Sequence, residues 1–186
     1  MDAAPPLTVA GLTARVLDAP PRLGGTRLVC VDGPAGSGKT TLAARLAAVL
    51  PDPVVVHMDE LYAGWTLTGA AARLSAGVLR PLADGRPGAY HAYDWAAGRF
   101  SSRPTPVPVP AVLVVEGCGS ACRATDAWAG LRIWVEADPA VRLARGLARD
   151  GAQLAGEWHR WQRTETAHFA EDGTRARADA VVDGRA

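Results

Sequence analysis

Five short apolar runs recur along the chain and predict the strands of a single sheet. They are Leu28–Val31, Val54–Val56, Ala111–Val115, Leu131–Val135 and Ala180–Val182. The first three are continuous rather than alternating, which is the pattern of central strands covered on both faces. We therefore expect these three to be central strands of a layered domain.

Segments with apolar residues at helical spacing separate these runs. Leu42–Leu50, which Pro51 ends, and Ala140–Ala148 predict helices. A further helix is expected around Leu7–Leu17, before a linker rich in proline and glycine. Residues 101–110 contain too many prolines for a helix and should be an extended edge or loop. Because strands and helices alternate, we expect an α/β fold, a three-layer doubly wound parallel sheet with right-handed crossovers.

Polar residues follow three of the predicted strands at their carboxyl ends. The first strand runs into Asp32, the second into residues 57–60 (His-Met-Asp-Glu), and the third into residues 116–117 (Glu-Gly). In open parallel sheets, ligands bind at this edge. The topology should therefore bring carboxylates that are distant in sequence to one rim.

Directly after Asp32, residues 33–40 (Gly-Pro-Ala-Gly-Ser-Gly-Lys-Thr) match G-x-x-x-x-G-K-[ST], the phosphate-binding P-loop. Glycines let successive backbone N–H groups turn toward phosphate oxygens, and the helix that follows adds its positive N-terminus. Lys39 is the only lysine in the chain, and it should reach the β- and γ-phosphates of ATP, while the Thr40 hydroxyl should ligate Mg²⁺. The alternative interpretation is a surface Gly/Ser loop. The residues expected to hold the nucleotide are Gly33, Ala35, Gly36, Ser37, Gly38, Lys39, Thr40 and Thr41.

Composition narrows the class of protein. A net charge of +1 with 21% charged residues gives no basic field of the kind that nucleic-acid binders use, so we expect no nucleic-acid partner. No apolar run reaches the roughly 18 residues that would span a membrane. Residues 1–6 lack the basic region of a secretory signal. Cys30, Cys118 and Cys122 fit neither a zinc pair nor C-x-x-C, which favours reduced, buried thiols in the cytoplasm.

Five motifs in a fixed order carry a resemblance to a known family. They are residues 31–33 running into the P-loop, residues 58–62 (Met-Asp-Glu-Leu-Tyr), residues 93–95 (Tyr-Asp-Trp) followed by Arg99, residues 115–117, and residues 142–150. Over residues 26–183 the chain resembles the uridine kinase and phosphoribulokinase branch of small-molecule P-loop kinases. The resemblance implies a P-loop nucleoside triphosphate hydrolase fold over 26–186, with a lid around 142–170. Residues 1–25 would be an N-terminal helix and linker.

The resemblance assigns Asp59 as the catalytic base that orients the acceptor hydroxyl and accepts its proton. Alternatives are that Asp59 is a helix N-cap, or that Glu60 is the base. Glu116 would act near Mg²⁺ with Thr40, directly or through water, and its alternative is a surface residue at the end of a strand. Asp32 either braces the P-loop or contacts the metal.

Arginines at 142, 145 and 149 fall on one face of the predicted helix, at i, i+3 and i+7. They either form an ordinary solvated face or, as in the kinases that the chain resembles, belong to a lid that closes over the transferring phosphate. Arg145 and Arg149 are the catalytic candidates together with Asp59 and Lys39, and Arg142 is the weaker one.

The acceptor pocket implied by the resemblance departs from the family pattern. Its expected residues are Asp59, Tyr62, Tyr90, Tyr93, Asp94 and Arg99. Uridine–cytidine kinases show Tyr-Asp-Phe followed by Thr-His-x-Arg, whereas Trp95 stands here for Phe and Ala96-Ala97 for Thr-His. The histidine that helps to read the pyrimidine is therefore missing, although His91 could replace it from the other side. The departure leaves the kinase interpretation standing and weakens the nucleoside one.

A final aromatic segment has Trp158, Trp161, Glu165 and Phe169 at helical spacing. It predicts either the packed face of one helix or a lid wall that touches a flat substrate. His57, His159 and His168 have no metal-ligand spacing, and we expect them to be structural.

Regulatory GTPases are disfavoured, because their Asn-Lys-x-Asp segment needs a second lysine. Three classes remain: a kinase acting on a hydroxyl of a nucleoside or another small alcohol, a nucleoside monophosphate kinase using Arg73, Arg80 and Arg99, and a non-catalytic ATP-binding regulator. We expect the first, with Mg²⁺ and ATP as cofactors and no membrane partner. The sequence indicates neither the acceptor nor the oligomeric state.

Overall fold

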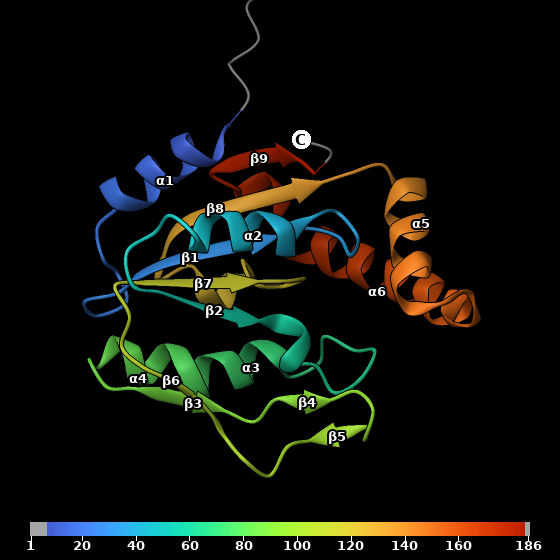
Figure 1. The fold of residues 1–186 in the computed structure, drawn as a ribbon, viewed down its shortest axis with the longest axis horizontal. Helices are drawn as coiled ribbons and strands as arrows, with labels where there is room; N and C mark the ends of the chain where they lie inside the picture. The colour runs from blue at the N-terminus through green and yellow to red at the C-terminus, as the bar shows by residue number, and fades with distance from the viewer. Residues whose placement is uncertain (1–6, 185–186) are drawn as a thin grey trace, which may run out of the picture.

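The computed structural model describes residues 7–184 and contains one five-stranded parallel sheet. The strands lie in the order β2 (Pro53–His57), β7 (Val112–Glu116), β1 (Arg27–Asp32), β8 (Ala129–Glu136) and β9 (Ala180–Asp183). All five predicted apolar runs therefore form strands of this sheet (Figure 1), and the predicted doubly wound α/β fold is confirmed. The expectation about residues 1–6 lies outside the described residues.

Helices cover both faces of the sheet. They are α1 (Val9–Asp18), α2 (Lys39–Ala47), α3 (Ala70–Leu74), α4 (Arg80–Ala83), α5 (Pro139–Asp150) and α6 (Ala155–Asp172), with a π-helical turn at Ser75–Leu79 and 3-10 turns at Met58–Glu60 (η1), Arg123–Thr125, Ala152–Leu154 and Arg175–Arg177. Among the described residues, no helix has the length and apolar character to cross a membrane.

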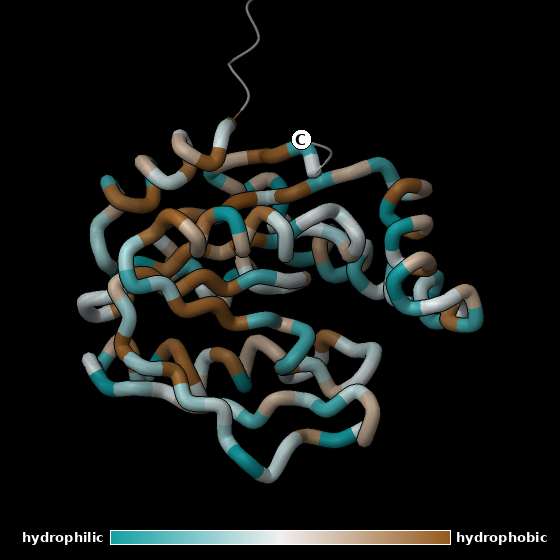
Figure 2. The backbone as a smooth tube through the Cα atoms, viewed as in Figure 1, coloured by the Kyte–Doolittle hydropathy of each residue, from teal (hydrophilic) through white to brown (hydrophobic). Residues whose placement is uncertain are grey.

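Alternate residues of the central strands supply two separate cores. On β7, Val112 and Val114 pack with α1 and α2, whereas Leu113 and Val115 pack with the segment from α3 to α4 and with Trp161 of α6. The hydropathy colouring shows apolar residues concentrated along these strands (Figure 2). The sheet is therefore the middle of three layers, as a doubly wound fold requires.

β2 differs from its predicted place. The continuous apolar run Val54–Val56 favours a central strand, but β2 is an edge strand that pairs only with β7 among the described residues. It is apolar on both faces because Val54 and Val56 pack with one core and Val55 with the other. A continuous apolar run therefore indicates that a strand is covered on both faces, and it does not indicate whether the strand is central or at an edge.

Short strands form a separate region between η1 and β7. β3 (Gly88–Tyr90) pairs antiparallel with β6 (Thr105–Val107), and β4 (Tyr93–Asp94) pairs antiparallel with β5 (Arg99–Phe100). β6 lies in the proline-rich segment expected to be extended. This region and α3 lie beside β2 and the carboxyl ends of the strands, where the acceptor side of the site is expected (Figure 1).

Candidate active site

The P-loop connects β1 to α2 and is shaped by glycines with positive φ. Gly33, Gly36 and Gly38 have φ of 138°, 77° and 105°. A Cβ at Gly33 would lie 2.1 Å from the backbone oxygen of Val135, so only glycine fits this turn. α2 begins at Lys39, directly after the loop, so the N-terminus of the helix faces the space where a phosphate would bind.

Asp32 ties the P-loop to the loop that follows β7. One carboxylate oxygen accepts hydrogen bonds from the N–H groups of Gly33 (2.7 Å) and Gly119 (3.0 Å), and the other accepts from Ala121 N–H (2.8 Å). The side chain is buried, and burial raises its pKa to about 6. These bonds support bracing, one of the two roles left open for Asp32, because both oxygens are engaged by backbone groups.

Two polar side chains of the P-loop are placed for an anionic ligand. The Lys39 ammonium donates to the Pro34 oxygen at 2.9 Å, so it lies along the loop itself. The Ser37 hydroxyl is buried and has no hydrogen-bond partner in the described structure. An unpaired buried hydroxyl and a loop of glycines fit a triphosphate, whose oxygens accept hydrogen bonds.

Glu116, at the end of β7, contacts two polar side chains. Its Oε1 accepts from the Thr40 hydroxyl at 3.2 Å and lies 2.6 Å from His57 Nδ1. The hydrogen bond to Glu116 raises the pKa of His57 against the opposing effect of burial. The carboxylate and hydroxyl oxygens fit Mg²⁺, which is held by one or two protein ligands together with phosphates and water. No group of three or more His, Cys, Asp or Glu within residues 7–184 could hold a metal.

Asp59 lies in η1, directly after β2, on the same rim as Glu116. Desolvation of its carboxyl and the neighbouring Glu116 charge raise the pKa of Asp59, while His57 and Arg149 act in the opposite direction. Glu60, the alternative base, accepts a hydrogen bond from the Tyr90 hydroxyl. Asp59 is therefore the exposed carboxylate of this pair, with its side chain free of the tyrosine contact.

The three arginines of α5 have three different environments. Arg142 is buried and pairs with Glu165 of α6 at 2.8 Å. Arg145 donates to the backbone oxygens of Gly36 and Gly184, so it ties α5 to the P-loop and to the end of β9. Arg149 binds Asp150 through two hydrogen bonds. In this arrangement Arg145 and Arg149 are committed to protein groups, and binding a phosphate would require them to exchange partners.

Aromatic rings line the side of the site where the acceptor is expected. Trp95 lies edge-on to Trp65 (5.7 Å between centroids) and to Tyr93 (5.3 Å), and its indole N–H donates to the Asp59 backbone oxygen at 3.2 Å. Nearly half of the Trp95 surface is exposed, at 45%. This wall therefore presents an accessible ring directly beside the carboxylate expected to act as the base.

Of the residues expected in the acceptor pocket, two are engaged by protein groups and a third is exposed. Tyr62 is buried, its hydroxyl donates to the Cys118 oxygen, and it packs on Trp161, so we assign it to the core. Asp94 accepts from two backbone N–H groups in the β4–β5 turn. Arg99 is exposed on β5, opposite Asp94 in the ladder. Tyr90 is buried with its hydroxyl on Glu60, and Tyr93 packs on Trp95.

The aromatic face of α6 is packed rather than open. Trp158 and Trp161 are 1% and 5% exposed. Trp158 lies against α5, where its N–H donates to Asp150, and Trp161 lies against Tyr62 and Trp65. The packed-helix alternative therefore describes this segment, and Trp65 is the ring that connects it to the exposed wall.

The sequence pattern assigns no functional role to His57, Glu165 or Trp65. His57 could have been selected because it ends a strand whose neighbours supply the other site residues. Glu165 carried a signal too, since a carboxylate in register with two tryptophans on a packed helical face is rarely buried without a partner.

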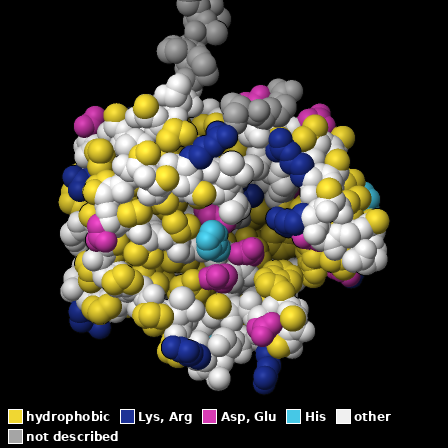
Figure 3. Space-filling view, in the orientation of Figure 1, with side chains coloured by type: hydrophobic (Ala, Val, Ile, Leu, Met, Phe, Trp, Pro, Cys, Tyr) yellow, Lys and Arg dark blue, Asp and Glu magenta, His cyan; other side chains and the backbone are white. Residues whose placement is uncertain are grey.

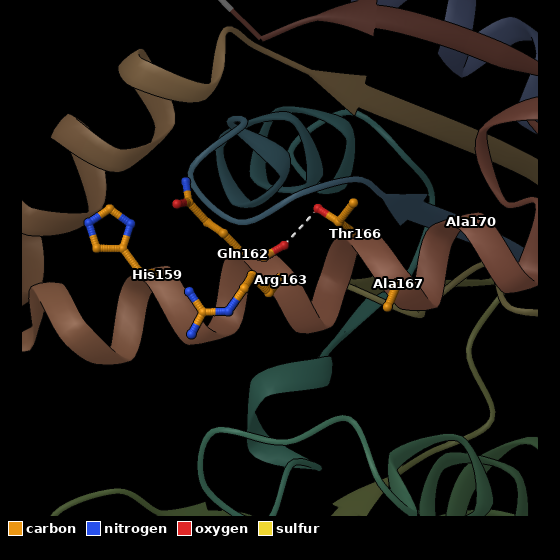
Figure 4. Close-up of a pocket in the computed structure, with 6 residues that line it drawn as sticks. All are labelled: His159, Gln162, Arg163, Thr166, Ala167 and Ala170. Atoms are coloured by element: carbon orange, nitrogen blue, oxygen red, sulfur yellow. Dashed lines mark hydrogen bonds between the residues drawn. The ribbon is translucent and has the colours of Figure 1, made fainter.

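A hollow on the molecular surface marks the site. Figure 3 shows acidic side chains and a histidine on one side of it and cationic side chains on the other, over the part of the molecule that contains α5 and α6. A second, shallow cavity of about 480 Å³ lies on the outer face of α6, lined by His159, Gln162, Arg163, Thr166, Ala167 and Ala170 (Figure 4). It is turned away from the P-loop, so we place no nucleotide there.

Comparisons with known proteins support the fold. A family model described as magnesium chelatase, subunit ChlI, matches residues 22–88, less than half of the chain, and no curated protein matches the sequence. A possible uridine kinase from Bacillus stearothermophilus superimposes with a TM-score of 0.70 at 19% identity, covering 94% of this chain and 97% of that one. A protein from Silicibacter sp. TM1040 described as a fructose transport system kinase gives 0.66 at 22%, covering 94% and 98%. The chain therefore has the P-loop kinase fold of these two proteins, as its motifs indicated.

Proposed function

We propose that the protein is a Mg²⁺- and ATP-dependent phosphotransferase that phosphorylates a hydroxyl group of a small molecule. One observation carries the proposal: the P-loop, the Thr40–Glu116 oxygen pair and the Asp59 carboxyl meet on one rim of the sheet. Both similar structures are described as kinases of small molecules, which supports the reaction class. A nucleoside is the acceptor that we favour, with an exposed aromatic ring at Trp95 for its base.

The proposed reaction is in-line transfer of the γ-phosphoryl group. The acceptor oxygen bonds to the γ-phosphorus, its proton passes to the Asp59 carboxylate, and the bond from the γ-phosphorus to the β–γ bridging oxygen breaks to release ADP. Backbone N–H groups of the P-loop and the Lys39 ammonium stabilise the charge that develops on the leaving phosphate. Mg²⁺, held by Thr40 and Glu116, would supply further neutralisation of the phosphates.

Transfer to a nucleoside monophosphate is less well supported. That reaction needs cations that grip the acceptor's phosphate. Arg73 donates instead to the backbone oxygens of Leu61 and Thr68 and lies over the ring of Phe100. Arg73, one of the three candidate cations, is thus already used to hold a loop, and the segment that it holds carries the carboxylates Asp59 and Glu60.

The three cysteines are buried and free, which supports a reducing, cytoplasmic setting as part of the same proposal. The proposed catalytic set is Asp59, Lys39, Arg145 and Arg149, with the two arginines exchanging their present partners for phosphate oxygens as the lid closes.

Product formation from ATP, Mg²⁺ and a mixed pool of nucleosides, nucleotides and hydroxylated metabolites, read by mass spectrometry, tests the proposal. Wild type should phosphorylate one acceptor. Asp59→Asn should lower kcat by about 10²- to 10⁴-fold, because general-base catalysis contributes that much, and should leave ATP affinity unchanged. Asp18→Asn is the matched control, since Asp18 is exposed at the end of α1 and far from the rim.

Three other results of these experiments would change the assignment. Phosphorylation of a monophosphate alone would replace our assignment with a nucleoside monophosphate kinase. ATP binding without any transfer by wild type would favour a non-catalytic regulator. Full ATP affinity and turnover in Lys39→Ala would overturn the assignment of the P-loop as the nucleotide site.

A further inference from the structure

Glu165 of α6 is a buried carboxylate that binds the backbone of the P-loop. Its side chain is 1% exposed. Oε2 accepts a hydrogen bond from Ala35 N–H at 2.7 Å, and Oε1 accepts from Arg142 Nη1 at 2.8 Å. A buried carboxylate is costly unless it is paired and hydrogen-bonded, and here both oxygens have a partner.

Arg142 of α5 makes a second contact with the backbone of the P-loop. Its guanidinium also donates to the Ala137 oxygen (3.1 Å) and to the Ala35 oxygen (3.4 Å). Ala35 is thus held at its N–H by Glu165 and at its C=O by Arg142. Arg142 also neutralises a negative charge that would otherwise lie beside a loop proposed to bind phosphates.

The backbone of α5 comes equally close to the loop. A Cβ at Gly36 would lie 2.5 Å from the Arg142 backbone oxygen. The loop at Ala35–Gly36 therefore cannot shift without moving the helices that carry Arg142 and Glu165.

The same helix reaches the acceptor side. Trp161, one turn before Glu165, packs on Tyr62 with 5.1 Å between ring centroids, and Tyr62 lies three residues after Asp59. One rigid element therefore touches both the P-loop and the segment that carries the proposed base.

We propose that Glu165 is a positioning residue, which holds the P-loop backbone in the conformation that binds phosphate and fixes its distance from Asp59. This inference rests on the proposed function. Glu165 acts on the loop through its hydrogen bond with Ala35 N–H, and its Oε2 also accepts a longer hydrogen bond from the Cys118 Sγ at 3.5 Å. Arg142 neutralises the charge of Glu165, which would otherwise repel a phosphate bound at the P-loop.

Two double variants isolate the bond to Ala35. Arg142→Met/Glu165→Gln and Arg142→Met/Glu165→Leu both lack the buried charges, and both lack the bonds that Arg142 makes. They differ at the position of Oε2, because glutamine keeps an oxygen that accepts from Ala35 N–H, and at longer distance from the Cys118 thiol, and leucine does not. Replacement of a buried ion pair by residues of similar volume is often neutral for stability, so both should fold.

The Leu variant should show about tenfold faster hydrogen exchange at the Ala35 amide, measured by NMR, and about tenfold weaker binding of ATP-Mg²⁺ by calorimetry. It should also have a lower kcat at saturating ATP. The Gln variant, which lacks the Arg142 bonds but keeps the acceptor for Ala35 N–H, should stay nearer to wild type than the Leu variant in all three. Equal exchange rates and equal ATP affinity in the two variants would overturn the inference.

Thermal melting shows whether each variant is folded, and Arg142→Met/Glu165→Met replaces the Leu variant if that one unfolds. The amide-exchange and ATP-binding measurements do not depend on phosphoryl transfer. If wild type binds ATP and transfers nothing, the proposed function fails while these two measurements still decide the role of Glu165.

Discussion

Asp32 shows how a single carboxylate can link site geometry to pH. It accepts three backbone hydrogen bonds in a buried position, and burial raises its pKa from the ordinary 3.8 to about 6. Between these two pH values the folded protein holds a proton that the unfolded chain has released. The stability that Asp32 contributes is therefore greatest below about pH 4 and falls as the pH rises to about 6.

Asp32→Asn should reveal this dependence. The free energy of unfolding of wild type, minus that of the variant, should decrease from pH 4 to 6 and stay constant above about pH 7. The variant should also be less stable by about 1–3 kcal/mol, because its amide group would place a donor against Ala121 N–H. Urea titrations at several pH values measure both effects. A difference that rises across this window would contradict the assigned pKa.

At the level of residues, the sequence predicts main-chain roles better than side-chain partners. Gly33, Gly36 and Gly38 were expected in the phosphate loop, and their positive φ values explain why glycine stands there. The bond from Glu165 to Ala35 joins residues 130 positions apart, and no local pattern encodes such a distance. Arg149 is a different case: its partner Asp150 is its neighbour in the chain, but spacing alone could not distinguish that partner from a phosphate.

The pair α5–α6 depends on one close approach between the two helices. A Cβ on Gly146 of α5 would lie 2.3 Å from the Trp158 ring of α6. The ring is buried and bonded to Asp150, so it has no free direction in which to move. Glycine in the interior of α5 is therefore required for packing, at a cost in helix propensity of about 1 kcal/mol.

Gly146→Ala should lower the free energy of unfolding by about 1–3 kcal/mol through overpacking, offset in part by the better helix propensity of alanine. Gly156→Ala is the matched control, because a Cβ there meets nothing within 4 Å and the change should be neutral or stabilising. Denaturant unfolding and limited proteolysis near residues 150–155 compare the two. Equal stability of both variants would show that the contact with Trp158 yields without cost.

Elements with a long pattern were predictable, and elements with a short one were not. The five strands of the sheet and the helices α2, α5 and α6 are each four residues or longer, and all were anticipated from the sequence. Between residues 61 and 100 the strands are only two or three residues long, and strands of that length carry no period. That region contains Trp65, Tyr93 and Trp95, the rings on the side where we propose that the acceptor binds. This side was therefore the least predictable part of the site.

For the molecule as a whole, the P-loop and the helices α5 and α6, which we propose to act as a lid, converge on one rim (Figure 1). A ligand bound there contacts elements from both ends of the chain, and a ligand that binds only the folded form stabilises it by mass action. The fold class followed from the alternation of strands and helices, whereas the acceptor depends on the shape of a pocket that this alternation does not specify.

ATP with Mg²⁺ at about 100 times its Kd should therefore stabilise the protein by about 2.7 kcal/mol and raise Tm by roughly 5–10 °C. Lys39→Ala should lose most of this shift, and Asp59→Asn should keep it, because the base is not expected to contact ATP. Differential scanning fluorimetry measures the shift in Tm for wild type and for the two variants. No shift in wild type at any ATP concentration would contradict nucleotide binding at the P-loop.

Lys39 carries the only side-chain amine in the chain, and it is buried in the P-loop with its nitrogen bonded to Pro34. Reagents that acylate amines therefore have a single internal target, which coincides with the proposed nucleotide site. Acylation of Lys39 therefore measures how much of the protein has ATP bound. The fraction of protein acylated at Lys39 should fall as the ATP concentration rises, and the experiment does not require the acceptor to be known. Because the chain has no other lysine, every molecule acylated on a lysine is acylated at Lys39, and we expect each such molecule to lose ATP binding.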